Sequence, residues 1–282
     1  MQALRKFLRK LLRIVAGVLI GGLTLLTGCQ GRFIYFPRPY ASGEIEEWQR
    51  KYHGEIIPYE TSAGRQQAYL QRKVRQQGPP ERFWLVAGGN AALALELADW
   101  LWENGDSRDA FLMIDFPGYG RCEGSPNPSR IHENMLAAVP AAIQKMGFSA
   151  AEIQPRMRIF AHSLGCAGTL LAAREFGIRR GILIAPFTST MDMTSQVLGV
   201  NVGFLLWHRF DNKARLHELA GPDAKFIIFH GTKDEVIPVA MSRQMKEEMP
   251  DLIDLREIPD GFHNDLFDAA EKAMSEAMAE VR

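Results

Sequence analysis

Short apolar runs alternate with longer helical patterns along most of the chain. Six runs have the length and composition of strands buried on both faces of a sheet: 83–87, 110–115, 157–162, 180–185, 225–230 and 254–258. Two earlier segments, 56–59 and 67–75, have the pattern of antiparallel edge strands. Strands that alternate with helices imply right-handed crossovers, so we predict an α/β fold with a mostly parallel sheet and helices on both faces.

The helical patterns begin and end at residues that favour helix termini. Ser129 and Asn264 are good N-caps, Pro238 suits a first helical position, and Gly177 suits a C-terminal position. The expected helices are 91–104, 129–146, 164–176, 238–249 and 264–281.

Residues 187–222 break the alternation with a long insert. Its apolar part, 197–207, contains two glycines and is too polar at its ends for a sheet strand. We predict that the insert forms a small cap over the active site; an ordinary crossover helix with its loops is the alternative. The predicted organisation is a leader at 1–29 and an α/β domain at 30–282 that carries this cap.

The leader has the pattern of an export signal. Five basic residues and no acidic residue lie in positions 1–13, and an apolar run at 14–27 follows. This run is shorter than the ~20 residues of a spanning helix and fits a signal peptide. Leu26-Thr27-Gly28-Cys29 resembles a bacterial lipobox, which implies cleavage before Cys29 and its lipidation. An uncleaved signal anchor and an interfacial helix are the alternatives.

The lipobox resemblance also implies a location. A lipidated Cys29 would attach the protein to a membrane of the bacterial cell envelope by its acyl chains. Gln30 follows in place of Asp, which in a Gram-negative cell implies the outer membrane.

Composition excludes several classes of function. The 282 residues include 33 basic and 33 acidic residues, so no global field attracts nucleic acid. No cysteine pair or Cys/His cluster has metal-ligand spacing, and we expect neither a metal nor a cofactor. Cys122 and Cys166 are predicted to be free, half-buried thiols, with a disulfide between them as the alternative.

A candidate nucleophile lies in Ala161-His162-Ser163-Leu164-Gly165. The motif follows an apolar strand and begins a helix, which is the context of a nucleophile elbow. The sharp turn needs small residues two positions before and after Ser163, and Ala161 and Gly165 satisfy this requirement. The helix N-terminus favours negative charge, and the Leu164 N–H can be an oxyanion donor. His162 is expected to form a wall of the substrate-binding pocket.

The acid and the base are expected after the nucleophile, in that order. Asp234 directly follows a strand, and His263 lies in the loop between the last strand and the last helix. Both loops can reach the carboxyl edge of the sheet beside Ser163, where Asp234 can hold the imidazole in its active tautomer. We therefore predict a Ser163, Asp234 and His263 triad. His230 is expected to be structural, and Glu235, Asp260 and Asp265 to be solvated loop or helix-start charges.

A second oxyanion donor is expected from the loop after the first parallel strand. Gly88 and Gly89 allow the backbone to approach the substrate closely, and Asn90 leads toward a helix. We predict that the N–H groups of Asn90 and Leu164 form the oxyanion hole and that Gly89 contacts the substrate.

Five segments together resemble one branch of the α/β-hydrolase superfamily. This branch includes bacterial membrane-associated hydrolases and eukaryotic protein depalmitoylating thioesterases. The resemblance runs from about residue 33 to the C-terminus and implies an eight-stranded sheet and the same triad and oxyanion residues. The branch usually has His where this chain has Gly88, and Gly where it has Ala161. The segments are 33–37, 89–91, 115–120 with 123–126, 161–165 and 230–234.

These features predict a serine hydrolase of an ester or thioester, with a small-molecule or acylated substrate that carries an apolar acyl group. Two other functions fit the same residues: a serine peptidase, and a catalytically inactive lipoprotein that binds envelope components.

Overall fold

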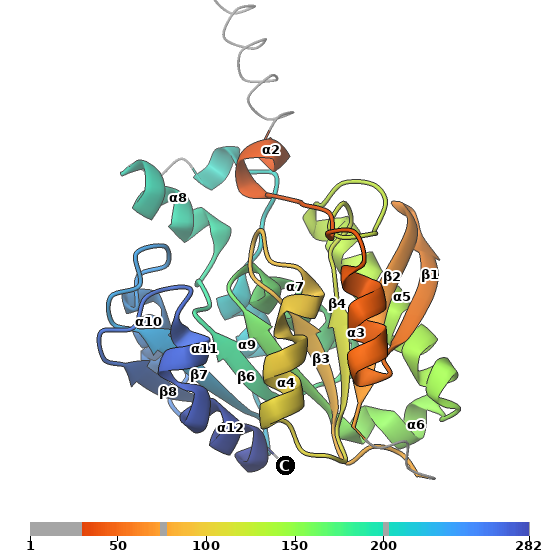
Figure 1. The fold of residues 1–282 in the computed structure, drawn as a ribbon. Coiled ribbons are helices and arrows are strands. Elements are labelled where there is room, and N and C mark those ends of the chain that lie inside the picture. Colours follow the sequence, from red (N-terminus) through yellow and green to blue (C-terminus); the bar gives the residue numbers. More distant parts are fainter. Residues whose placement is uncertain (1–29, 74–77, 200–202, 282) are drawn as a thin grey trace, which may run out of the picture.

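The structure is a computed structural model that describes residues 30–73, 78–199 and 203–281 (Figure 1). Eight strands form one sheet in the order β1-β2-β4-β3-β5-β6-β7-β8. Only the β1–β2 and β2–β4 pairs of this sheet are antiparallel, so the predicted mostly parallel sheet is confirmed. The strands are β1 (Glu55–Thr61), β2 (Gly64–Arg72), β3 (Phe83–Ala87), β4 (Ala110–Ile114), β5 (Met157–His162), β6 (Arg180–Ile184), β7 (Lys225–Gly231) and β8 (Ile253–Ile258).

The central strands are apolar because helices cover both of their faces. Every residue of β3 and β4 is buried. In Figure 1, α5, α7 and α9 lie behind the sheet, while α3, α4 and α12 lie in front of it. The α-helices are α2 (Gln30–Ile34), α3 (Glu44–Tyr52), α4 (Ala98–Asn104), α5 (Pro128–Met146), α6 (Ala150–Ile153), α7 (Leu164–Phe176), α8 (Thr190–Leu198), α9 (Asn212–Leu219), α10 (Ala240–Glu248), α11 (Leu266–Ala269) and α12 (Glu271–Glu280), with 3₁₀ turns η1 (Ala94–Leu97), η2 (Gln154–Arg156) and η3 (Gly203–Leu205).

Two predicted helix starts were wrong by a few residues. Helix α5 begins at Pro128, and its N-cap is Asn127, whose side chain accepts from the Arg130 N–H at 2.9 Å. Helix α10 begins at Ala240, after a turn in which the Met241 N–H donates to the Pro238 carbonyl.

The first and last predicted helices also differ from the structure. The segment after β3 turns at Asn90 and Ala91, where the Ala92 N–H donates to the Gly89 carbonyl, and η1 and α4 follow only after Leu93. Ala91 takes a positive φ of 63° that a helix cannot contain. The last segment divides into α11 and α12 at Ala270, and Asp265 replaces Asn264 as the residue before α11.

The predicted cap region, 187–222, contains α8, η3 and α9. Helix α9 packs against α7 on one face of the sheet, and α8 lies at the carboxyl edge of the strands (Figure 1). The apolar run at 197–207 includes residues 200–202, which lie outside the described residues. The leader and Cys29 also lie outside them. Over 30–73, 78–199 and 203–281, no helix reaches the length and apolarity needed to cross a bilayer.

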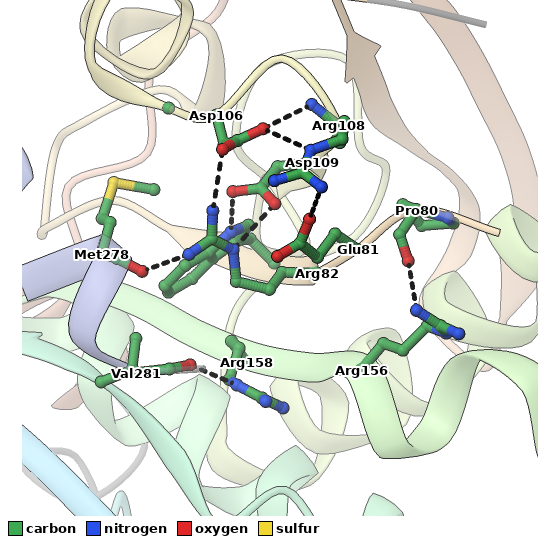
Figure 2. A network of polar contacts seen from close by, with 12 residues as sticks. Pro80, Glu81, Arg82, Asp106, Arg108, Asp109, Arg156, Arg158, Met278 and Val281 are labelled. Carbon is green, nitrogen blue, oxygen red and sulfur yellow. Dashed lines mark hydrogen bonds and ion pairs between the residues drawn. The ribbon is translucent and has the colours of Figure 1, made fainter. Parts of the chain in front are cut away.

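A polar network at the amino edge of the sheet fastens the C-terminal helix (Figure 2). Arg82 is buried, donates to Asp109 at 2.8 Å, and donates to the Met278 carbonyl of α12 at 2.6 Å. Arg158 donates to the Val281 carbonyl at 2.6 Å. Helices α11 and α12 follow the loop that carries His263. These bonds therefore fix the C-terminal end of the segment that begins with that loop.

Candidate functional site

Ser163 occupies a strained turn between β5 and α7. Its φ and ψ are 53° and −118°, a combination that costs a non-glycine residue free energy and persists only where packing enforces it. Packing is tight here: a Cβ at Gly165 would lie 2.3 Å from the Ala87 carbonyl oxygen. The small residue predicted at 165 is therefore required by the approach of β3, and the turn presents the Ser163 hydroxyl at the N-terminus of α7.

Two loops at the same edge carry Asp234 and His263. A Cβ at Gly231 would lie 2.2 Å from the Gly261 carbonyl oxygen, so the loops after β7 and β8 touch through their backbones. The Lys233 N–H donates to the Gly261 carbonyl, and the His263 N–H donates to the Glu235 carboxylate at 3.2 Å. Contact between the two loops therefore sets the position of the imidazole.

The structure brings the three predicted triad residues together. The Nδ1 atom of His263 lies 2.7 Å from Asp234 Oδ2, and its Nε2 atom lies 3.1 Å from Ser163 Oγ. All three side chains are buried or nearly so. Because a carboxylate can only accept, His263 donates to Asp234 from Nδ1. Its Nε2 atom then has a lone pair that can accept the proton of the Ser163 hydroxyl.

The Asp234 carboxylate is held as an anion. Burial raises its pKa, but hydrogen bonds from His230, His263 and the Ile237 N–H outweigh burial and hold the pKa well below its usual range. The Val236 N–H also donates to Asp234, at 2.9 Å.

His162 lies beside the imidazole of His263 and does not reach Ser163. Its Nε2 atom lies 3.1 Å from the His263 carbonyl oxygen, and the two rings are 4.8 Å apart. Burial and the neighbouring His263 lower the pKa of His162 to about 4. His162 is therefore neutral at pH 7, donates from Nε2, and helps to position the loop of His263.

The predicted oxyanion loop is held by the Asn90 side chain. Its Oδ1 accepts from the Phe36 N–H at 3.1 Å and from the Tyr119 hydroxyl at 2.7 Å, and its Nδ2 donates to the Ile34 carbonyl at 2.6 Å. Among the described residues, no hydrogen bond uses the backbone N–H of Asn90 or of Leu164. Both N–H groups are available at the edge where Ser163 lies.

Gly88 and Gly89 line a cavity of about 400 Å³ behind this loop. His162, Trp100 and Phe267 line the same cavity, which lies between α4 and α11. A Cβ at Gly89 would lie 2.9 Å from His162 Nδ1, so the loop approaches the elbow closely at this residue. The side chain expected at 88 from the resemblance is missing here, and the Asn90 hydrogen bonds brace the loop.

Comparisons with curated sequences find distant relatives. The chain is 29% identical over 244 residues to an uncharacterized protein of Mycobacterium tuberculosis, covering 82% of this chain and 79% of that protein. It is 27% identical over 234 residues to the uncharacterized protein YfhR of Salmonella typhimurium, covering 76% and 71%. It is 24% identical over 158 residues to human alpha/beta hydrolase domain-containing protein 17C, covering 55% of this chain and 44% of that protein. No family model matches the chain.

Solved structures share the architecture over most of the chain. The esterase Pf2001 of Pyrococcus furiosus aligns with a TM-score of 0.65 at 11% identity, covering 88% of this chain and 96% of the esterase. Est1E of Butyrivibrio proteoclasticus aligns with a TM-score of 0.59 at 16% identity, covering 80% and 98%. The chain has the α/β-hydrolase fold. At these identities the likeness concerns the fold alone.

In the α/β-hydrolase fold of this chain, two residues have roles that the sequence analysis missed. His230, expected to be structural, is fully buried and lies 3.3 Å from Asp234. Glu235, expected to be a solvated charge, accepts from the His263 N–H. Their closeness to Asp234 in the sequence could have indicated these contacts: His230 lies near the end of the strand before Asp234, and Glu235 directly follows Asp234.

The remaining predicted residues are placed as follows. Asp260 pairs with Lys233 at 2.9 Å, and Asp265 accepts from the Phe262 N–H at 2.8 Å. Cys122 and Cys166 are free, as predicted, but both are buried and not half-buried. Within the described ranges, no group of three or more His, Cys, Asp or Glu residues is arranged to hold a metal ion.

Proposed function

We propose that the protein is a serine hydrolase that cleaves a carboxylic ester or thioester through an acyl-enzyme. The observation that carries the proposal is the continuous hydrogen-bonded line from Asp234 through His263 to Ser163, with 2.7 Å and 3.1 Å between the bonded atoms. The strained backbone of Ser163 supports it, because such strain concentrates at functional sites.

The reaction would proceed in two acyl transfers. His263 Nε2 takes the Ser163 proton while Oγ attacks the carbonyl carbon, and the oxyanion accepts hydrogen bonds from the Asn90 and Leu164 N–H groups. The C–O or C–S bond then breaks, and His263 returns its proton to the leaving group. A water activated by His263 attacks the acyl-enzyme, which releases the carboxylic acid and restores the Ser163 hydroxyl.

We further propose that the substrate carries an apolar acyl group and that the protein is attached to a membrane of the bacterial cell envelope. The leader, its Cys29 and the resemblance to membrane-associated hydrolases support the attachment. A lipid anchor at Cys29 would keep the enzyme where acyl esters, or acylated proteins, are concentrated.

A fluorophosphonate probe and a series of p-nitrophenyl esters test the proposal on the full chain. We expect the wild type and the control Ser149→Ala, at a serine that caps α6 far from the site, to be labelled and to hydrolyse the butyrate ester. Ser163→Ala should lose labelling and about 10⁴-fold or more of the turnover. Labelling that survives in Ser163→Ala would overturn the assignment of the nucleophile.

The same series separates the alternatives. Turnover that rises from acetyl to dodecanoyl esters supports an apolar acyl group, whereas a flat profile contradicts it. Turnover of aminoacyl p-nitroanilides without ester turnover would favour a peptidase. A folded protein without labelling or turnover would favour the inactive binding lipoprotein.

A further inference from the structure

Large apolar side chains are exposed on one edge of the molecule. Among the described residues, those exposed by more than a third lie on α2 and the segment after it, on α8, on η3 and the segment after it, and on the loops after β7 and β8. These segments all lie at the carboxyl edge of the sheet, where Ser163 is found (Figure 1). Val236 and Phe262, exposed by 47% and 48%, lie on the two loops that carry Asp234 and His263.

Four aromatic residues form the most exposed part of this edge. Phe33, Phe36, Phe204 and Trp207 are exposed by 75%, 55%, 65% and 75%, and we call these four residues the aromatic platform. Isolated exposed apolar residues are normal on a protein surface, but several on one face mark an interaction site.

Contacts between the two segments make the platform one surface. The Gln30 side chain donates to the Leu205 carbonyl at 2.7 Å and accepts from the Trp207 N–H at 2.8 Å. The rings of Tyr35 and His208 meet edge to face with centroids 5.3 Å apart. Helix α2 is therefore fastened to the residues after η3, although about 175 positions separate them in the sequence.

The segments that form the platform carry an excess of positive charge. Residues 30–40 and 203–210 contain three arginines and no Asp or Glu. Arg38 is paired with Glu96, and Arg209 donates to the Phe204 and Leu206 carbonyls, which orders the backbone beneath the rings. Phenylalanine and tryptophan beside arginine are the side chains that favour the interface between lipid headgroups and acyl chains.

The place where the leader ends indicates what covers the platform. Gln30, the first described residue, directly follows Cys29 and belongs to the helix that carries Phe33. Insertion of the apolar run at 14–27, or acylation of Cys29, would therefore place a bilayer next to α2.

We propose that the aromatic platform docks on a lipid bilayer, with the Ser163 edge of the sheet turned toward the membrane. The proposal rests on the membrane attachment proposed above and adds an orientation to it. This orientation would turn the site toward esters held in the bilayer. The platform is linked to the site, because the Phe36 N–H donates to the Asn90 side chain of the oxyanion loop.

Fluorescence of Trp207 tests the orientation in the full chain. The protein is reconstituted into vesicles of phosphatidylcholine and phosphatidylglycerol, with or without bromine on the acyl chains as a contact quencher. We expect bromine to reduce the emission of the wild type, and Trp207→Phe to lose this reduction. Trp102→Phe is the matched control, because Trp102 lies near the end of α4 at the opposite edge, beside Lys73; its emission should still be reduced.

If brominated lipids do not reduce the emission of the wild type, the proposal is wrong. Trp207 would then be covered by a second copy of the chain, by the leader or by water. A reduction that persists in Trp207→Phe would also overturn it, because the quenched tryptophan would then lie elsewhere.

Activity gives an independent measurement. Replacement of Phe33, Phe204 and Trp207 together by Ser should leave hydrolysis of soluble p-nitrophenyl butyrate unchanged and reduce hydrolysis of a dodecanoyl ester embedded in vesicles by about tenfold or more. Equal rates for variant and wild type on the embedded ester would contradict docking. Absence of butyrate turnover in the wild type would instead count against the proposed hydrolase. The fluorescence measurement would still test the docking, because it does not depend on activity.

Discussion

His230 Nε2 lies 3.3 Å from Asp234 Oδ2, the carboxylate oxygen that also binds His263 at 2.7 Å. The same Nε2 lies 2.7 Å from the Ile237 carbonyl, which can only accept, so this nitrogen carries the proton. The other nitrogen, Nδ1, lies within hydrogen-bond distance of the Ser242 hydroxyl, at 2.7 Å. A fully buried imidazole thus donates toward the acid of the candidate triad.

We expect His230→Gln to lower kcat by about tenfold, with a smaller change in KM, because Asp234 loses a donor that holds its pKa down. The acid limb of kcat/KM should also move to higher pH, because the pKa of Asp234 rises when this donor is lost. A pH–rate profile checks both. Ser242→Ala removes only the hydrogen bond at His230 Nδ1. It should lower kcat and move the acid limb in the same direction, but by less. An acid limb that stays in place would mean that His230 acts on stability alone.

The elbow gives a matched pair of substitutions. Gly165→Ala should abolish activity and lower the free energy of unfolding by about 3 kcal/mol, since its Cβ would lie 2.3 Å from the Ala87 carbonyl oxygen. Ala161→Gly, which introduces the residue more usual in the resembling branch, should retain activity and lose only about 1 kcal/mol of stability. Urea denaturation with an esterase assay checks the pair, and equal effects of the two substitutions would contradict the steric argument.

The oxyanion loop should depend on the Asn90 side chain even though its proposed donor is a backbone N–H. We expect Asn90→Ala to lower kcat by about 10²-fold, because the loop loses its bonds to Ile34, Phe36 and Tyr119. Tyr119→Phe removes one of these bonds and should cost about tenfold. Measurement of kcat and KM for both variants tests this order. If Asn90→Ala keeps the wild-type kcat, the loop does not need this brace.

His162 should make the fold less stable in acid. Burial lowers its pKa from 6.5 to about 4, so between these values the unfolded chain binds more protons than the folded one. Stability is fully present above pH 6.5 and falls as the pH drops toward 4, by about 3 kcal/mol for this group. We expect His162→Asn to lose less stability than the wild type between pH 7 and pH 4.5, as measured by urea denaturation.

Asp115 supplies the control of opposite sign. Burial raises its pKa from 3.8 to about 6, so its contribution to stability falls as the pH rises through that range. Asp115→Asn should therefore gain stability at pH 7 relative to pH 4.5, compared with the wild type. Parallel stability curves for the wild type and both variants would show that neither group titrates in the folded protein.

The amino-acid sequence by itself determined the strands, their mostly parallel arrangement and the candidate triad. These features depend on local patterns: apolar runs that only a doubly covered sheet can bury, and small residues on both sides of Ser163. The chain order Ser, then Asp, then His made it possible to predict that Ser163, Asp234 and His263 interact although they are distant in the sequence. Helix starts were displaced where a neighbouring cap or a positive φ decided them, as at Asn127 and Ala91.

Only the tertiary structure decided which groups support the site. His230 acts on Asp234, Phe36 braces Asn90, and Gln30 accepts from the Trp207 N–H, because segments far apart in the sequence meet at one edge. Such contacts depend on the distances between folded elements, and no pattern of single residues encodes them. The exposure of the aromatic platform is of the same kind, since an apolar residue in a loop is buried or exposed according to what the fold brings against it.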